Sequence, residues 1–108
     1  MPIYNKLVRD RIPEIIANTG KLYTSRILDE SEYITEVNKK MGEELTEYLE
    51  TTTAEDAIEE LADILELIHA AAAHHGSTFE ELNKVRVEKA KKRGGFNERI
   101  FLVEVEDD

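Results

Sequence analysis

The sequence predicts an all-α protein, a helical bundle to which two short β-strands are added. Three observations support this fold class. Long segments repeat apolar residues at the three-and-four spacing of one helix face. Capping residues precede these segments and glycines follow most of them. Only two short stretches have the composition and length of strands. A chain of 108 residues is expected to form a single domain, residues 1–108.

The first predicted helix is short and lies between Asp10 and Gly20. Asp10 is its expected N-cap, and Pro13 falls in the first turn, where a backbone N–H is not needed. Gly20 is expected to end the helix. Residues 21–28 then predict a short strand whose partner is distant in the sequence. Its two faces would be Leu22, Thr24, Arg26 and Leu28 on one side, and Tyr23, Ser25 and Ile27 on the other.

Two long helices are predicted next. The first begins at Asp29 or Ser31 and runs to about Glu50, and the second is capped by Thr53 and runs to the neighbourhood of His75. The second of these helices is apolar around nearly its whole circumference. Such a helix is typical of the interior of a bundle.

The last predicted elements are a fourth helix and a second strand. Ser77 and Glu80 have the spacing of a capping box and predict the start of the helix. It is expected to end near Arg93, where two glycines follow. Residues 100–105 predict the second strand, paired with residues 21–28.

The composition excludes several classes of function. The chain has 24 acidic and 14 basic residues and a net charge of −10, which argues against a nucleic-acid polymer as partner. It has no cysteine, so disulfide and thiolate metal sites are excluded. Its longest apolar stretch is interrupted by carboxylates, which argues against a membrane span. The first residues show no signal-peptide core, and we expect a cytoplasmic protein.

Four carboxylates on the two long helices are the main functional candidates. Glu44 and Glu47 stand three residues apart, and Glu60 and Asp63 repeat this spacing. Residues at this spacing are neighbours on a helix, so an antiparallel hairpin would bring all four together. In so acidic a chain, acidic pairs at this spacing also arise by chance. Whether these two pairs are functional therefore depends on which face of each helix they occupy.

The place of two of these carboxylates is unusual. Glu44 and Glu60 each occupy one position of an apolar seam, where carboxylates rarely persist without a partner. The two seams are Ile34, Val37, Met41, Glu44 and Tyr48 in the first long helix, and Ala57, Glu60, Ile64, Leu67 and Ala71 in the second.

Two interpretations of this cluster are open from the pattern alone. Carboxylates in an apolar seam repel each other and lose hydration. A hard divalent cation removes this conflict, and Mg²⁺, or Mn²⁺ in its place, is the expected ion where a phosphate substrate shares the ligands. The other interpretation is an acidic, solvated helix face with ordinary ion pairs.

The fourth helix is basic in an otherwise acidic protein. Its charges either complement the negative end of the helix dipole or form a clamp for phosphate. The basic side chains are Lys84, Arg86, Lys89, Lys91, Lys92 and Arg93.

Taken together, these segments resemble a known superfamily. Glu-x-x-Glu, twelve residues and Glu-x-x-Asp on two helices resemble the MazG-like nucleoside triphosphate pyrophosphohydrolases, which include phosphoribosyl-ATP pyrophosphohydrolases and dimeric dUTPases. The opening Lys6-Leu7-Val8-Arg9-Asp10-Arg11-Ile12-Pro13 and the segment from Lys89 to Arg93-Gly94-Gly95-Phe96 are similar to a small single-domain branch of it.

The resemblance implies a fold, an activity and an assembly. It implies a MazG-like helical bundle and a Mg²⁺-dependent hydrolase that cuts a nucleotide between its α and β phosphates. It further implies a homodimer or tetramer. Carried over to this chain, the metal ligands and catalytic residues are Glu44, Glu47, Glu60 and Asp63, and the phosphate contacts are Lys40, Lys89 and Arg93.

Two alternatives stay open beside this expectation. The substrate is either a free nucleoside triphosphate or phosphoribosyl-ATP, because both use the same metal chemistry. A non-catalytic helical metal-binding or regulatory module would use the same carboxylates for structure only.

Overall fold

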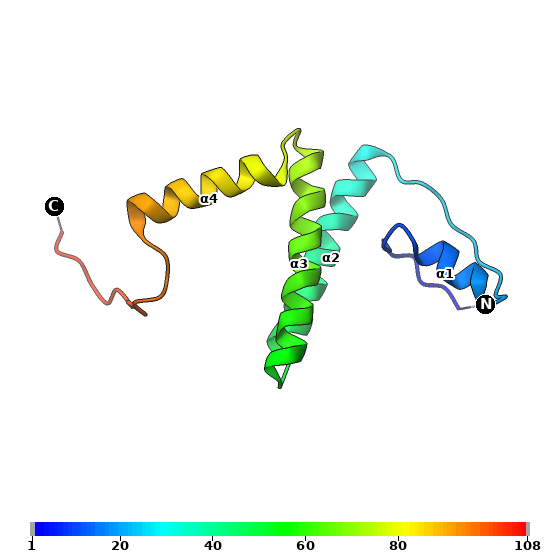
Figure 1. Ribbon diagram of the computed structural model, residues 1–108, viewed down its shortest axis with the longest axis horizontal. Helices are drawn as coiled ribbons and strands as arrows, with labels where there is room; N and C mark the ends of the chain where they lie inside the picture. Colours follow the sequence, from blue (N-terminus) through cyan, green and yellow to red (C-terminus); the bar gives the residue numbers. More distant parts are fainter. Residues whose placement is uncertain (1, 108) are drawn as a thin grey trace.

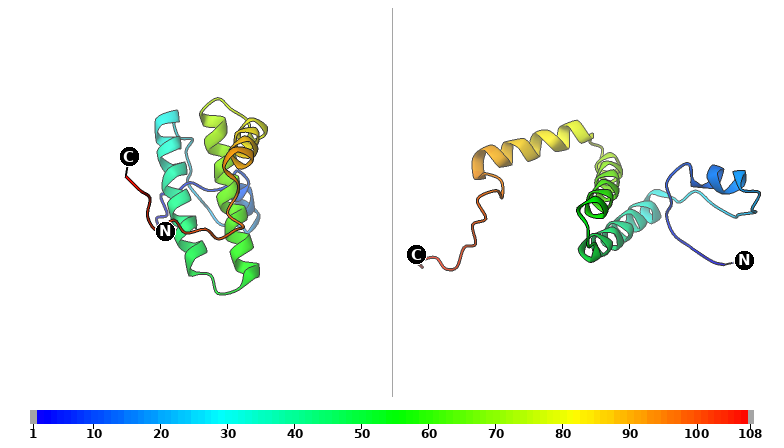
Figure 2. Two further views of the ribbon diagram at one scale, coloured as in Figure 1. Left: turned by 90° about the vertical axis from the view of Figure 1, so that its left-hand side faces the viewer. Right: turned by 60° about the horizontal axis from the view of Figure 1, so that its bottom comes forward.

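The computed structural model describes residues 2–107, which form four α-helices and no strand. The helices are α1 (Ile12–Asn18), α2 (Glu30–Glu50), α3 (Ala54–His74) and α4 (Phe79–Arg93). Helices α2 and α3 lie side by side as an antiparallel hairpin (Figures 1 and 2). The N-terminal segment with α1 lies on one side of this hairpin, and α4 leads away on the other. The predicted all-α class is confirmed.

The two long helices begin at side-chain caps. At the start of α2, the Asp29 carboxylate accepts a hydrogen bond of 2.8 Å from the Glu32 N–H, and Glu32 accepts one in return from the Asp29 N–H. This reciprocal pair satisfies N–H groups that have no partner within the helix. Thr53 caps α3 and accepts a hydrogen bond of 3.1 Å from the Asp56 N–H. Of the two predicted starts of α2, Asp29 is therefore the cap.

The apolar seams predicted for these helices face each other in the hairpin. Every position of both seams is buried or half-buried. Val37 is fully buried and Leu67 is 9% exposed, and they form the centre of the packing. Because the seams include Glu44 and Glu60, the packing of the hairpin carries two carboxylates inward.

A glycine and an aromatic contact shape the junction of α3 and α4. Gly76 has a φ of 77°, and the Ser77 N–H returns to the Ala72 carbonyl at 2.9 Å, as in a Schellman motif. Beyond this turn, Phe79 stacks on His69 with ring centroids 4.0 Å apart. The chain therefore leaves the hairpin at a defined point, and α4 starts against α3.

Two predicted helix caps are wrong by one residue. The N-cap of α4 is Thr78, which accepts a hydrogen bond of 3.1 Å from the Glu81 N–H. Ser77 instead donates its hydroxyl hydrogen bond to the Glu81 carboxylate at 2.7 Å. At α1, the capping position belongs to Arg11, which makes no side-chain cap, rather than to Asp10.

The two predicted strands are absent from the described chain. Residues 21–28 and 100–105 have no strand structure, and they lie on opposite sides of the molecule (Figure 1). Leu22 is 86% exposed and Ile100 is 85% exposed, so neither segment packs on a partner. Both segments contain residues that favour strands, but a strand also needs a neighbour for its backbone hydrogen bonds.

Much apolar surface stays exposed in the single chain. On α3, Ile58 and Leu65 are 65% and 45% exposed, although the sequence predicted a helix buried all round. No helix within residues 2–107 is long and apolar enough to cross a membrane.

Candidate metal centre

The hairpin brings three of the four predicted carboxylates together. Oxygen atoms of Glu44, Glu47 and Glu60 all lie within 4.8 Å of one another. Glu44 and Glu47 come from successive turns of α2, and Glu60 comes from the facing side of α3. Opposite oxygen ligands of Mg²⁺ lie about 4 Å apart, so only small side-chain rotations separate this arrangement from a ligand set.

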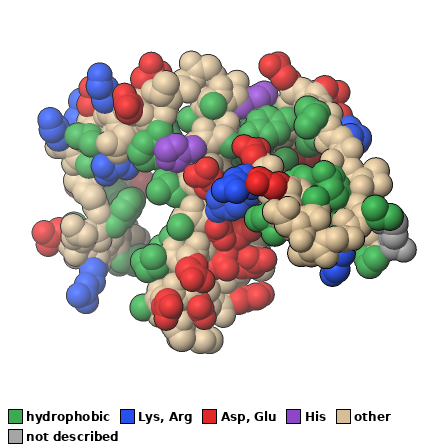
Figure 3. Space-filling view, turned by 45° about the vertical axis from the view of Figure 1, so that its right-hand side comes forward, with side chains coloured by type: hydrophobic (Ala, Val, Ile, Leu, Met, Phe, Trp, Pro, Cys, Tyr) green, Lys and Arg blue, Asp and Glu red, His purple; other side chains and the backbone are tan. Residues whose placement is uncertain are grey.

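The cluster runs from the interior of the hairpin to its surface. Glu44 is 8% exposed, Glu60 is half-buried and Glu47 is exposed. The interpretation as a solvated acidic face therefore does not fit Glu44. Figure 3 shows Asp and Glu side chains gathered on the hairpin, with Lys and Arg side chains against them.

Two oxygens of the cluster have no hydrogen-bond partner. Oε2 of Glu44 and Oε2 of Glu60 are buried, and neither accepts a hydrogen bond from any residue in the described part of the chain. Buried carboxylate oxygens normally have partners, because leaving one bare costs free energy. The two residues share the cluster from neighbouring helices, and a hard divalent cation would supply the missing partner, because it prefers oxygen ligands of this kind.

The electrostatics of Glu44 agree with this geometry. Burial raises the pKa of its carboxyl group from 4.5 to about 7, and the neighbouring Glu60 and Glu47 carboxyl groups and the charge of Asp63 add to the effect. Without a cation, the Glu44 carboxyl group therefore keeps its proton to a higher pH than an ordinary glutamate does. Positive charge placed between these groups would lower its pKa again.

Asp63 takes a different partner. Its Oδ1 accepts a hydrogen bond of 2.6 Å from Nη2 of Arg9, which lies 54 positions earlier in the chain. Asp63 is close enough for its charge to act on Glu44, but it is not one of the three carboxylates that share the cluster. The N-terminal segment thus reaches the edge of the candidate metal centre.

The predicted phosphate contacts fall in two places. Lys40 lies beside the cluster, with its Nζ 3.9 Å from Oε1 of Glu44. Lys89 and Arg93 lie in the second half of α4, which leads away from the hairpin (Figure 1). Within one chain, α4 therefore does not bring these two side chains to the carboxylates.

The sequence prediction missed Arg9 as a residue of this site. The segment that contains it was recognised only by its resemblance to a family branch, and no role was assigned to it. A signal was present, because Lys6, Arg9 and Arg11 make this segment basic in a strongly acidic chain. Nothing in the local pattern, however, says which acidic residue it meets.

The fold and the site define an all-helical protein with a carboxylate cluster suited to a divalent cation inside a helix hairpin. The family model for phosphoribosyl-ATP pyrophosphohydrolase matches residues 4–90, and the chain belongs to this family. The predicted resemblance to the superfamily that contains it is confirmed.

One relative matches half of the chain. An uncharacterised protein of Mycolicibacterium smegmatis is 39% identical over 54 residues, which are 50% of this chain and 55% of that protein. The chain thus matches about half the length of this relative. No solved structure gives a significant match.

Proposed function

We propose that the protein is a Mg²⁺-dependent nucleotide pyrophosphohydrolase, which cuts between the α and β phosphates and releases pyrophosphate. The observation that carries the proposal is the pair of buried, unpartnered oxygens of Glu44 and Glu60 on facing helices. Membership of a pyrophosphohydrolase family supports hydrolysis of a pyrophosphate bond as the reaction at this site. When bound, Mg²⁺ would supply a water of lowered pKa and positive charge at the phosphate oxygens.

In this proposal the hairpin residues hold the metal. Glu44, Glu47 and Glu60 are the central ligands. Asp63 is the fourth ligand, once it exchanges its contact with Arg9 for one with the metal. Glu44 must give up its proton to bind a cation, which its raised pKa of about 7 permits at neutral pH. Lys40, on the rim of the cluster, is placed to meet a phosphate oxygen.

We further propose that the active form is a homodimer or tetramer. The chain exposes 10,023 Å², whereas a compact monomer of 12.4 kDa exposes about 6,100 Å² by general scaling. Its radius of gyration is 18.7 Å, against about 13 Å for a compact domain of this length. Counted per chain, this excess is larger than the share that one subunit usually buries in an obligate dimer, so an extensive interface with neighbouring copies would be needed to cover it.

Assembly also gives a role to the basic helix. Because α4 leads away from its own hairpin, we propose that Lys89 and Arg93 reach the carboxylates of a neighbouring copy. The exposed apolar residues of α4, Leu82 and Val85, are 37% and 50% exposed and give this helix a face for such contact.

The substrate class is tested by pyrophosphate release. The panel contains canonical nucleoside triphosphates, damaged and deoxy forms, and phosphoribosyl-ATP, each with Mg²⁺. Release from at least one of them, lost in the Glu60→Gln variant, is the expected result. Release from none, by a protein that binds Mn²⁺, favours the non-catalytic metal-binding module.

A chelator separates these two functions further. A structural metal site contributes folding free energy, so the module should unfold when the metal is removed. The proposed enzyme should keep its helical signal in circular dichroism and lose only turnover.

A further inference from the structure

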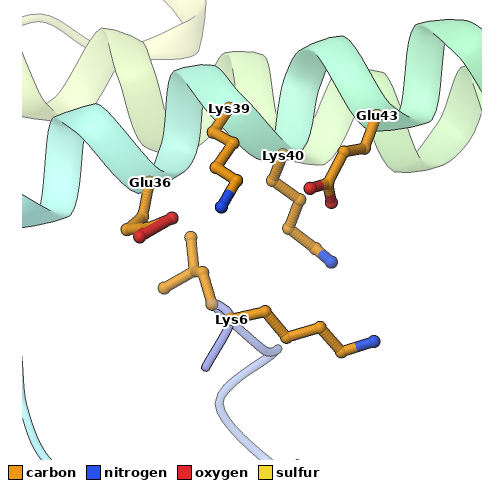
Figure 4. A pocket seen from close by; sticks show the side chains of 6 residues that line it. Lys6, Glu36, Lys39, Lys40 and Glu43 are labelled. Atoms are coloured by element: carbon orange, nitrogen blue, oxygen red, sulfur yellow. The ribbon is translucent and has the colours of Figure 1, made fainter. Parts of the chain in front are cut away.

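A group of basic side chains borders the candidate metal centre on the side of the N-terminal segment. Lys6, Lys39 and Lys40 line one small pocket between this segment and α2 (Figure 4). Lys39 and Lys40 point from α2 toward the segment that carries Lys6. Arg9 continues the group to Asp63. We call these four residues the basic rim.

The N-terminal segment holds the rim at a fixed place. Leu7 is half-buried and lines the same pocket, so an apolar contact attaches the segment to α2. Two residues on, the Arg9 carbonyl accepts a hydrogen bond of 3.0 Å from the Ile12 N–H, at the first turn of α1. The backbone of Arg9 is thus fixed on both sides, and its side chain crosses to Asp63 on α3.

Arg9 has unused capacity for hydrogen bonds. A guanidinium carries five N–H donors in a fork that matches phosphate oxygens. Among residues 2–107, Arg9 gives one side-chain hydrogen bond, from Nη2 to Asp63. Its side chain is 56% exposed, and an exposed ion pair of this kind costs little to rearrange. Arg9 can therefore take a phosphate in place of, or beside, Asp63.

The charge of the molecule makes such a group necessary. A polyphosphate approaching a protein of net charge −10 needs a local positive field. Two carboxylates, Glu36 and Glu43, also line the pocket, so its three lysines leave an excess of one positive charge there. A rim that served only to neutralise carboxylates would pair each cation. Lys6 and Lys39, however, form no salt bridge within the described residues.

We propose that Arg9 is a phosphate-binding residue of the same chain, which holds the pyrophosphate end of the substrate beside the carboxylates. The inference rests on the proposed function and adds to it a substrate contact from the N-terminal segment. In the free protein, the contact with Asp63 keeps the guanidinium at the site. In the complex, its remaining donors bind phosphate oxygens, as charge-assisted hydrogen bonds.

Isothermal titration of the whole protein with two probes tests this role. Mn²⁺ is titrated first, and inorganic pyrophosphate is then titrated into the Mn²⁺-saturated protein. Arg9→Gln should weaken pyrophosphate binding by about tenfold, the usual size for one charged hydrogen bond. Mn²⁺ should bind with the same or higher affinity, because Asp63 is released. Arg11→Gln is the matched control, because Arg11, the N-cap of α1, pairs only with Glu14 in the first turn of that helix among the described residues.

Two results would overturn the role of Arg9. Pyrophosphate affinity of Arg9→Gln equal to that of Arg11→Gln would mean that the rim does not contact phosphate there. A loss of Mn²⁺ affinity in Arg9→Gln would mean that Arg9 only orients Asp63. Arg9→Lys is the substitute variant if Arg9→Gln fails to fold. Lysine keeps the charge but not the forked donors of arginine, so it should lose less pyrophosphate affinity than glutamine does.

Failure of the proposed function looks different. A wild-type protein that releases no pyrophosphate from any nucleotide contradicts the function itself. An active wild type with unchanged pyrophosphate binding in Arg9→Gln contradicts only the inference about Arg9.

Discussion

Replacing Glu44 by glutamine should stabilise the metal-free protein, and only at neutral and alkaline pH. The Glu44 carboxyl group has its pKa raised from 4.5 to about 7 in the folded state. Between these two values the folded state holds a proton that the unfolded state has released. The wild-type protein therefore loses stability as pH rises through this window, and the full cost is present above pH 7. Glutamine cannot ionise and avoids this cost.

The magnitude follows from the size of the shift. The rise of the Glu44 pKa from 4.5 to about 7 corresponds to about 3 kcal/mol, since one pKa unit is worth about 1.4 kcal/mol. The side chain is only 11% exposed, so solvent screens little of it. Glu44→Gln should gain up to about 3 kcal/mol near pH 8 and almost nothing near pH 4.5. Saturating Mg²⁺ should reverse the order, because the wild type then binds the cation better.

Urea unfolding in a chelator measures this difference. The free energy of unfolding is determined near pH 4.5, 6 and 8 at one fixed protein concentration, since assembly would make stability depend on concentration. Glu43→Gln is the matched control, because Glu43 is the adjacent, exposed carboxylate of the same helix. A Glu44→Gln gain that is the same at all pH values, or a loss near pH 8, would refute the reasoning.

Four further predictions concern the metal, the activity and the assembly. Mn²⁺ soaked into crystals should give one or two anomalous peaks between α2 and α3, and peaks away from the carboxylates would contradict the site. Glu60→Gln should lower turnover by orders of magnitude with its circular dichroism unchanged, and near-wild-type turnover would exclude a metal ligand at this position. Arg93→Ala should raise KM or lower kcat/KM and leave Mn²⁺ affinity nearly unchanged; lower stability with intact kinetics would show a structural residue instead. Light scattering at micromolar concentration should give at least twice the 12.4 kDa of one chain, and a monomer mass would contradict the assembly.

The hairpin could be predicted from the sequence because its signals are local. Each seam repeats over about four turns, and the caps at Asp29 and Thr53 stand at the starts of the same helices. The position of Glu44 within an apolar seam predicted its burial. These features depend on spacing along one helix, and spacing is visible in the sequence.

The errors arise where structure depends on distant partners. Residues 21–28 have the length and composition of a strand, but whether a strand forms depends on a neighbour 70 or more residues away in the chain. The two segments do not meet. The contact between Arg9 and Asp63 spans 54 positions and leaves no local pattern. The predicted start of α4 was wrong by one residue because Ser77 and Thr78 can both cap a helix. The backbone conformation determines which of them takes the cap position.

The connection between α2 and α3 has a consequence for the order in which the protein forms. Only residues 51–53 separate the two helices, so the entropy lost in closing the hairpin is small and its contacts are short in sequence. Glu44 and Glu60 can therefore meet as an event within one chain, at a rate that does not depend on protein concentration. The contacts proposed for Lys89 and Arg93 of a second copy, in contrast, form only after two chains associate. Dilution should then separate the two halves of the site, with cation binding persisting at concentrations where turnover has already been lost.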